Sequence, residues 1–352
     1  MTEIADYKQA FIRNNWYAAA WRREIDTRPL ARTILGERLA LFPTKEGGIG
    51  ALKDQCPHRL APLSMGECID GGLRCGYHGL LFNASGACIN VPGQDFIPTT
   101  AKVKSYPVRE RLGLVWVWMG DAEPDESRLP SIPQHGEPGW ALLQDGYQHH
   151  AANYRIEIEN LMDPAHTTYL HKQTIGNPAA KDVPVQVERN ERSISAFRWM
   201  ERTPPSPFDK QSRDFGDGLV DRMVSFSFEL PGVSFVEVCS MPTGLDKTED
   251  NKNLGLRTLS YKFLTPEDER HTHFFWLHLR NHRLDDTAYE QQLRAGLEKT
   301  YVEDNQVASA IQIEQERCGK RQFTGLKIDH APTMALRLLD TMIADEQATA
   351  VA

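Results

Sequence analysis

Two short segments in the first third of the chain each place a cysteine close to a histidine. The first is CPHRLAPLSMG, residues 56–66, and the second is CGYHGLLFNASG, residues 75–86. Thiolate and imidazole are both strong metal ligands, and a metal centre that takes ligands from both segments must bring them together. These segments therefore constrain the fold of this part of the chain more than any other feature, because two separate loops have to meet.

The distribution of the ligands favours a two-iron cluster over a zinc ion. The order is Cys56-x-His58, sixteen residues, then Cys75-x2-His78, so each arm offers one sulfur and one nitrogen. Zinc fingers instead pair two cysteines at one end and two histidines at the other. In a Rieske [2Fe–2S] cluster, two histidines replace two cysteines on one iron. We interpret the four residues as ligands of such a cluster. A structural zinc site, or packed side chains without metal, are the alternatives.

A second candidate metal site lies in NLMDPAHTTYLH, residues 160–171, which contains Asn160, Asp163, His166 and His171. The two histidines can supply part of the 2-His-1-carboxylate triad that binds non-haem Fe(II). Asn160 and Asp163 are the candidate catalytic residues. Residues five apart in an α-helix point about 140° away from each other, so we expect a π-type turn between the histidines. We expect Asp163 to hold one nitrogen of His166 while iron takes the other.

The third iron ligand is expected from a long amphipathic helix over residues 285–319. Asp304 falls in the apolar stripe of that helix, between Tyr301 and Ala308, whereas Glu303 falls on the flank. A carboxylate that faces the core is costly unless it is paired or bound to a metal. We therefore predict Asp304 as the third ligand, with Glu303 as the second choice.

The arrangement of elements along the chain predicts an α+β fold in two domains. Residues 14–120 are rich in short strand-like runs bounded by Gly, Pro and Asp, and they contain the Cys–His segments. Residues 121–140 are rich in proline and glycine and are expected to be a connection. Residues 141–352 combine β-branched and aromatic strand patterns with the long helix, so we expect an antiparallel sheet in a catalytic domain that holds the single iron.

Composition excludes several classes of protein. The net charge of −8 argues against a nucleic-acid-binding protein. The most apolar stretch, LGLVWVWMG at residues 112–120, is half the length of a membrane span. We find no signal peptide, and six cysteines among 352 residues do not make a disulfide framework. We therefore expect a cytoplasmic protein that does not enter a membrane.

Together with these two candidate metal sites, other segments make the chain resemble the oxygenase component of Rieske non-haem iron oxygenases over nearly its whole length. The markers are NNWYAAAW, CPHRLAPLSMG, CGYHGLLFNASGAC, VPGQ, GLVWVWMGD, NYRIEIENLMDPAHTTYLH and EDNQV. They are most similar to the branch that includes vanillate O-demethylase, dicamba O-demethylase and toluenesulfonate methyl-monooxygenase. The resemblance assigns the cluster and iron ligands as above and implies a helix-grip-like catalytic domain. It also implies a homotrimer in which Asp163 bridges His78 of one chain and His166 of the next.

The resemblance implies hydroxylation, or O- or N-demethylation, of an aromatic substrate with O2. The chain has no G-x-G-x-x-G dinucleotide motif and no plant-type C-x4-C-x2-C spacing, so a separate NAD(P)H reductase, in some systems with a ferredoxin, must supply the electrons. Two alternatives remain at this point. One is a ring cis-dihydroxylating dioxygenase of the same superfamily, and the other is a Rieske electron carrier without oxygenase chemistry. Counting irons separates the carrier from the oxygenases.

Overall fold

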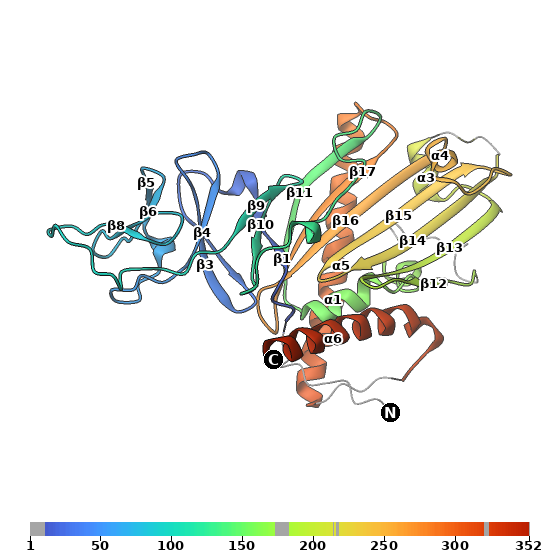
Figure 1. The fold of residues 1–352 in the computed structure, drawn as a ribbon. Coiled ribbons are helices and arrows are strands. Elements are labelled where there is room, and N and C mark those ends of the chain that lie inside the picture. The colour runs from blue at the N-terminus through green and yellow to red at the C-terminus, as the bar shows by residue number, and fades with distance from the viewer. Residues whose placement is uncertain (1–10, 173–182, 214, 216–217, 320–323, 352) are drawn as a thin grey trace. The chain divides into compact units, whose positions relative to one another are not determined.

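The computed structural model describes residues 11–172, 183–213, 215, 218–319 and 324–351. Within them the chain forms two compact units (Figure 1). The N-terminal unit contains residues 11–129 and a short return of the chain, Thr265–Asp268. The C-terminal unit contains residues 130–264 and those after Asp268. The division between the units falls inside the proline-rich connection that separates the two kinds of sequence pattern.

Three small antiparallel sheets build the N-terminal unit. The first has the order β1-β10-β9, the second β2-β3-β4 and the third β5-β6-β7-β8. Their bounds are β1 Trp16–Trp21, β2 Leu30–Ile34, β3 Glu37–Pro43, β4 Ile49–Lys53, β5 Glu67–Ile69, β6 Gly72–Arg74, β7 Leu81–Phe82, β8 Cys88–Asn90, β9 Val108–Arg111 and β10 Leu114–Trp118. Short 3-10 helices occur at Arg22–Glu24, Leu63–Met65 and Glu126–Arg128.

Two apolar clusters hold this unit together. One fills the space between the first two sheets with residues such as Tyr17, Leu41 and Val117. The other lies beneath the Cys–His loops and includes Phe42 and Phe82, with Cys56 and Cys75 among its buried members. Since the two cysteines belong to this packed cluster, the loops that carry them are fixed to the core of the unit.

A seven-stranded antiparallel sheet forms the C-terminal unit, in the order β11-β17-β16-β15-β14-β13-β12. Its bounds are β11 Ala141–His150, β12 Gln186–Arg189, β13 Ser193–Thr203, β14 Val220–Glu229, β15 Val233–Pro242, β16 Leu256–Pro266 and β17 Thr272–Arg280. From β12 to β17 each strand pairs with the next one in sequence, and β11 then pairs with β17 at the edge. The β-branched and aromatic residues of these strands suit a pleated, buried surface.

The helices of this unit are α1 Tyr154–Leu161, α2 Thr167–Leu170, α3 Pro207–Ser212, α4 Glu249–Asn253, α5 Thr287–Cys318 and α6 His330–Val351, with a 3-10 turn at Lys327–Asp329. The long helix predicted over 285–319 is α5. Asp286 caps its first turn by accepting the Tyr289 N–H at 2.9 Å. Gly319 ends it with a left-handed φ of 65°. The sequence analysis did not predict α6, which packs against α1 and β13.

Tyr301 shows how α5 packs on the sheet. Its ring lies 5.1 Å from that of Phe274 and 5.4 Å from that of Trp276, both on β17. Its hydroxyl is 2.9 Å from the hydroxyl of Ser260 on β16. This contact fixes the rotation of α5 about its axis, and with it the direction in which Asp304, one turn later, points.

Candidate functional site

Each of the two Cys–His segments folds into a turn of the same kind. The carbonyl oxygen of Cys56 accepts the N–H of Leu60 at 2.9 Å, and that of Cys75 accepts the N–H of Gly79 at 3.0 Å. Leu60 and Gly79 have φ angles of 59° and 74°, which reverse the chain at the end of each turn. The repeated sequence motif therefore corresponds to a repeated backbone geometry.

The four candidate cluster ligands form two pairs. Cys56 and Cys75 are buried, and their sulfurs lie within hydrogen-bonding reach of each other. His58 and His78 are exposed, with ring centroids 4.5 Å apart. A tetrahedral zinc site would gather all four ligand atoms within about 4 Å of one another, and in the described part of the chain these four do not form such a group. A sulfur pair beside a nitrogen pair suits a cluster with one iron for each.

The surroundings of Cys56 disfavour a free thiolate. Burial, together with the adjacent Cys75, raises the pKa of Cys56 to about 11. The backbone N–H groups of His58 and Arg59 oppose this shift by donating to the sulfur. Without a metal the thiol stays protonated at neutral pH. The same backbone donors stabilise a metal-bound thiolate.

The loops need a close backbone approach at Gly66. A Cβ atom there would lie 1.9 Å from the carbonyl oxygen of Arg74, so no larger residue fits without moving the chain. On the outer side, Val91 and Pro92 line a hollow of about 560 Å³ together with the two histidine rings. The VPG segment thus forms a third side of the loop cluster.

The second candidate site brings His166, His171 and Asp304 together. One ligand atom from each lies within 4.8 Å of the other two. The Nε2 atoms of His171 and His166 are 3.0 Å and 3.6 Å from Asp304 Oδ1. The imidazole planes are inclined at 78°. His171 and Asp304 are buried, and His166 is partly exposed.

The prediction of a π-type turn between the histidines is wrong. A break in the helix brings the two side chains together instead. Helix α1 ends at Leu161, a turn follows, and α2 covers only Thr167–Leu170. His166 is the residue before α2, and His171 the residue after it, with φ −101° and ψ 36°. Because the backbone leaves the helical conformation at His171, its side chain swings towards that of His166.

The polar atoms at this site are arranged for a cation. Although Asp304 Oδ1 lies 3.0 Å and 3.6 Å from the two imidazole Nε2 atoms, among the described residues it accepts no hydrogen bond. Burial raises the pKa of Asp304, but contact with His171 and His166 and the nearby Asn160 amide outweigh burial and lower it. A carboxylate and two imidazoles that converge in this way fit the donor set of non-haem Fe(II).

Glu303 and Asp163 lie outside this group. Glu303 Oε2 accepts the Nδ1–H of His171 at 2.9 Å, so it contacts the nitrogen that faces away from Asp304. The expected hydrogen bond from His166 to Asp163 is not formed, since Asp163 Oδ2 is 3.9 Å from His166 Nδ1. The other oxygen of Asp163 accepts the N–H of Ala165 at 2.7 Å instead. Burial raises the pKa of Asp163. The Asp163 and Glu303 carboxylates therefore flank the site from its two outer sides.

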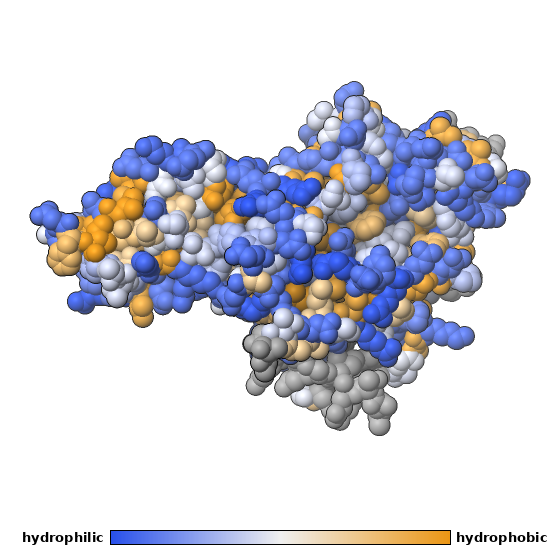
Figure 2. All heavy atoms as spheres, in the orientation of Figure 1, coloured by the Kyte–Doolittle hydropathy of each residue, from blue (hydrophilic) through white to orange (hydrophobic). Residues whose placement is uncertain are grey.

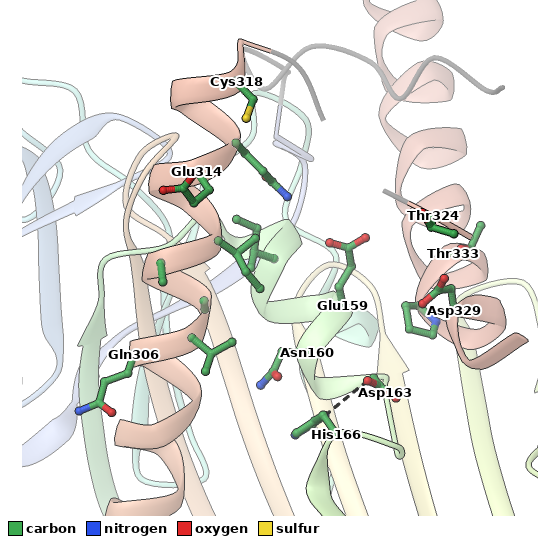
Figure 3. A pocket seen from close by; sticks show the side chains of 17 residues that line it. Glu159, Asn160, Asp163, His166, Gln306, Glu314, Cys318, Thr324, Asp329 and Thr333 are labelled. Carbon is green, nitrogen blue, oxygen red and sulfur yellow. Dashed lines mark ion pairs between the residues drawn. The ribbon is translucent and has the colours of Figure 1, made fainter. Parts of the chain in front are cut away.

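A cavity of about 790 Å³ opens beside His166 and Asp163. Figure 3 shows the two side chains joined by their ion pair, with Asn160 and Glu159 on the same segment. Gln306 and Glu314 of α5 form one wall, and α6 and the turn before it form the other. The cavity leaves Asp163 accessible from outside the unit.

Sequence reasoning missed a set of buried polar side chains on the α5 side of the sheet. Lys262, His278 and Arg280 are at most 4 % exposed. The signal was present in the alternation of polar and apolar residues along β16 and β17, which places every second residue on one face. The sequence alone did not identify these residues, because the pattern along a strand does not show which side chains pack against it.

Two family models match the chain. The Rieske [2Fe–2S] domain matches residues 15–107, and the vanillate O-demethylase oxygenase C-terminal domain matches residues 150–345. The second match covers more than half of the chain, and it contains His166, His171 and Asp304. A pure electron carrier would have no use for this second domain.

Relatives cover almost the whole chain. A putative toluene-4-sulfonate monooxygenase system iron-sulfur subunit of Comamonas testosteroni is 34% identical over 95% of this chain and 98% of its own length. The oxygenase component of the chloroacetanilide N-alkylformylase of Rhizorhabdus wittichii is 33% identical over 96% and 97%. A crystal structure of dicamba monooxygenase with non-heme iron and dicamba superposes with a TM-score of 0.79 at 29% identity, over 97% of this chain and 100% of that one.

The fold agrees with these matches, since an α+β catalytic unit with one large antiparallel sheet follows a β-rich Rieske unit. Within the described residues, none of the helices combines the length and the apolar character that crossing a bilayer requires. The cofactors of this protein class are a Rieske [2Fe–2S] cluster and a non-haem iron. The chain belongs to the Rieske non-haem iron oxygenases, as an oxygenase component with the catalytic domain of the vanillate O-demethylase family.

Proposed function

We propose that this oxygenase component hydroxylates or demethylates an aromatic substrate, with His166, His171 and Asp304 as the ligands of its single iron. The observation that carries the proposal is the convergence of two imidazole Nε2 atoms and one carboxylate oxygen, which accepts no hydrogen bond from the described residues. When bound, the iron activates O2 and the cluster held by Cys56, His58, Cys75 and His78 supplies electrons.

Glu303 and Asp163 are proposed to position the two imidazoles. By accepting the Nδ1–H of His171, Glu303 selects the tautomer whose Nε2 lone pair is free to bind a metal. Asp163 lies on the Nδ1 side of His166, but at 3.9 Å it accepts no hydrogen bond from that ring, and its proposed effect on His166 is electrostatic. The two carboxylates differ in surroundings, since Asp163 faces the cavity of Figure 3. Asp163 is therefore the one that a partner can reach.

We infer that the chain works as a homotrimer in which electrons pass between chains. His78 is exposed in the loop between β6 and β7, and the apolar residues Tyr77, Leu60 and Met65 of the two Cys–His segments are exposed as well. Apolar side chains gather over this part of the N-terminal unit in Figure 2. We propose that this part docks on the neighbouring chain so that His78 of the partner subunit faces Asp163. Head-to-tail contacts of this kind close a ring when the rotation per chain divides a circle.

Electrons are proposed to come from a separate NAD(P)H-dependent reductase, because the chain contains no dinucleotide-binding fingerprint of its own. In some systems of this kind a ferredoxin lies between the two. We place the enzyme in the cytoplasm, where thiols remain reduced. None of the six cysteines, all of which lie in the described residues, forms a disulfide.

The proposal names a class of substrate and two possible outcomes. Hydroxylation of an O-methyl or N-methyl carbon gives a product that collapses with release of formaldehyde, whereas hydroxylation of a C-methyl group gives an alcohol. Among the relatives, one is named for an anionic sulfonate and another for an uncharged anilide. The choice between these classes depends on the interior of this chain.

The experiment is a panel of methoxy-, N-methyl- and methyl-substituted aromatic compounds with a surrogate reductase and NADH. We expect O2 uptake coupled to formaldehyde or a benzylic alcohol for at least one compound. A cis-dihydrodiol as the main product would assign the enzyme to the ring dioxygenases instead. Reduction of the cluster without any O2-dependent product across the panel would contradict the proposed function.

A further inference from the structure

Three histidines gather on β11, the edge strand of the seven-stranded sheet, and on its neighbour β17 (Figure 1). His149 of β11 is the direct cross-strand partner of His273 of β17. His271 lies two residues before His273, and side chains two apart along an extended chain project to the same side of a sheet. The rings of His149 and His271 are stacked, with centroids 5.3 Å apart and planes inclined at 10°. The three imidazoles therefore lie together on one face.

This face of the sheet is turned away from α5. Phe274 of β17 contacts Tyr301 of α5, so the adjacent residue His273 projects to the other side. On β11, His150 stacks on Phe274 with ring centroids 4.5 Å apart, and its neighbour His149 accordingly faces the other way as well. The histidine cluster is thus on the opposite face of the sheet from the helix that carries the candidate iron-binding carboxylate.

Two of the three rings are already close enough to share one metal ion after a small rotation. A ligand nitrogen of His149 lies within 4.8 Å of one of His273, and the ring centroids are 5.5 Å apart. Two nitrogens on one tetrahedral zinc ion are about 3.4 Å apart, because each Zn–N bond is about 2.0–2.1 Å long. His149 is exposed and His271 half-buried, so both rings are free to turn towards the buried His273.

Tyr147 holds the buried ring from its outer side. The Tyr147 hydroxyl is 2.9 Å from His273 Nδ1, and the two rings are stacked with centroids 6.1 Å apart. When the hydroxyl oxygen accepts the Nδ1–H, the ring is fixed in the tautomer whose Nε2 lone pair binds a metal. Glu303 contacts the Nδ1 of His171 in the same way at the candidate iron site. The histidine cluster therefore has the outer partner that metal-binding histidines usually have.

We propose that His149, His271 and His273 bind a zinc ion at a site separate from both iron centres. Three imidazoles leave one tetrahedral position for water, and nitrogen donors select zinc over Mg²⁺ and Ca²⁺, which prefer oxygen. The ion joins β11 to β17 and so fastens an edge strand whose pairing is interrupted between Leu143 and Gly146. The inference goes beyond the proposed function and does not rest on it.

Metal counting on the iron-loaded enzyme tests the site. The anaerobic protein is dialysed against free Zn²⁺ buffered at about 10 µM, which fills a site with a Kd of about 1 µM or below. Zinc and iron are then measured in the same sample. We expect about one zinc per chain with the iron content unchanged. The absence of zinc uptake would overturn the inference, and so would zinc that enters only as iron is lost, because it would then occupy the iron site.

Single substitutions locate the ion. His149→Gln and His271→Gln each remove one imidazole at a position that is at least partly exposed. Each should weaken zinc binding at least as much as the loss of an outer partner does, roughly tenfold or more. The control is His330→Gln, which removes an exposed histidine at the start of α6 and should bind zinc as the wild type does. Equal zinc affinity in the wild type and both variants would mean adventitious binding only and would overturn the inference.

A second measurement follows the strand itself and needs no variant. Zinc should slow amide hydrogen exchange in residues 146–150 of β11, because an ion bound to both strands opposes the local opening of the edge. Should both glutamine variants fail to fold, this comparison of the wild type with and without zinc still decides. Unchanged exchange in these residues with zinc bound would show that the ion does not join β11 to β17, and would overturn the inference.

Discussion

Replacing Glu303 by glutamine separates the role of a positioning carboxylate from that of a metal ligand. Glu303 Oε2 accepts the Nδ1–H of His171 at 2.9 Å, while the His171 Nε2 faces Asp304 at 3.0 Å. Glutamine keeps the shape and a carbonyl acceptor but removes the negative charge. The hydrogen bond to Nδ1 persists in weakened form, and the amide NH2 group can instead face Nδ1 and favour the wrong tautomer.

The expected loss of iron affinity follows from the difference between a charged and a neutral acceptor. A hydrogen bond to a charged group contributes about 1.5–3 kcal/mol and one between neutral groups about 0.5–1.5 kcal/mol. The Glu303 side chain is 21% exposed, which screens part of the charge. We therefore expect a loss of about 1.4 kcal/mol, or roughly tenfold in iron affinity, at the lower end of the range for outer partners of metal-bound histidines.

The assay is competition for ferrous iron between the protein and a chromophoric chelator, with the visible spectrum of the cluster as an internal reference. Glu314→Gln is the matched control, since Glu314 is exposed on the same helix and its ion pair is with the exposed Arg317. Iron affinity equal to that of the control would refute the positioning role of Glu303. Complete loss of the single iron, as expected for Asp304→Asn, would show that Glu303 is itself a ligand.

Two further outcomes are expected. Asp163→Ala should retain both metal centres but lose reduction of the iron site by the cluster, measured by single-turnover kinetics; full turnover would contradict the bridging role. Gly66→Ala should lose the cluster spectrum and several kcal/mol of stability because its Cβ meets the Arg74 carbonyl oxygen at 1.9 Å, whereas Gly296→Ala, in open space on α5, should stabilise by about 0.5–1 kcal/mol in urea unfolding.

Burial of Lys262 makes the stability of the protein depend on pH. The pKa of Lys262 is lower in the folded protein than in the unfolded chain, so the unfolded chain holds an additional proton between about 7 and 10.5. Stability of the ligand-free protein should therefore rise with pH across this window. The nearby His278 has a pKa lowered to about 3 by burial, and Asp304 also has a lowered pKa, so neither titrates in the same range.

The features that sequence predicted best are those set by local spacing. The Cys–His pairs imply two equivalent loops because each thiolate needs a turn behind it, and such turns are present after Cys56 and Cys75. Helix α5 carries its own end signals in Asp286 and Gly319, and its apolar stripe points Asp304 inward. These inferences needed no knowledge of the three-dimensional arrangement.

Other features depend on contacts that are distant in sequence. The geometric objection to two histidines five apart was sound, but the chain resolves it by ending a helix at Leu170, not by widening one. Helix α6 is apolar on the side that meets α1, a partner that its own sequence does not identify. The burial of Lys262 depends on what packs against it across the interior, and a strand pattern shows only that the residue lies on one side of the sheet.

The central claim, one Rieske cluster and one separate iron held by His166, His171 and Asp304, is tested most directly by counting metal. Wild-type protein should contain about three irons and two acid-labile sulfides per chain. Asp304→Asn should contain about two irons per chain, with both sulfides and the visible spectrum of the cluster unchanged. Two irons in the wild type, or three in the variant, would contradict the account.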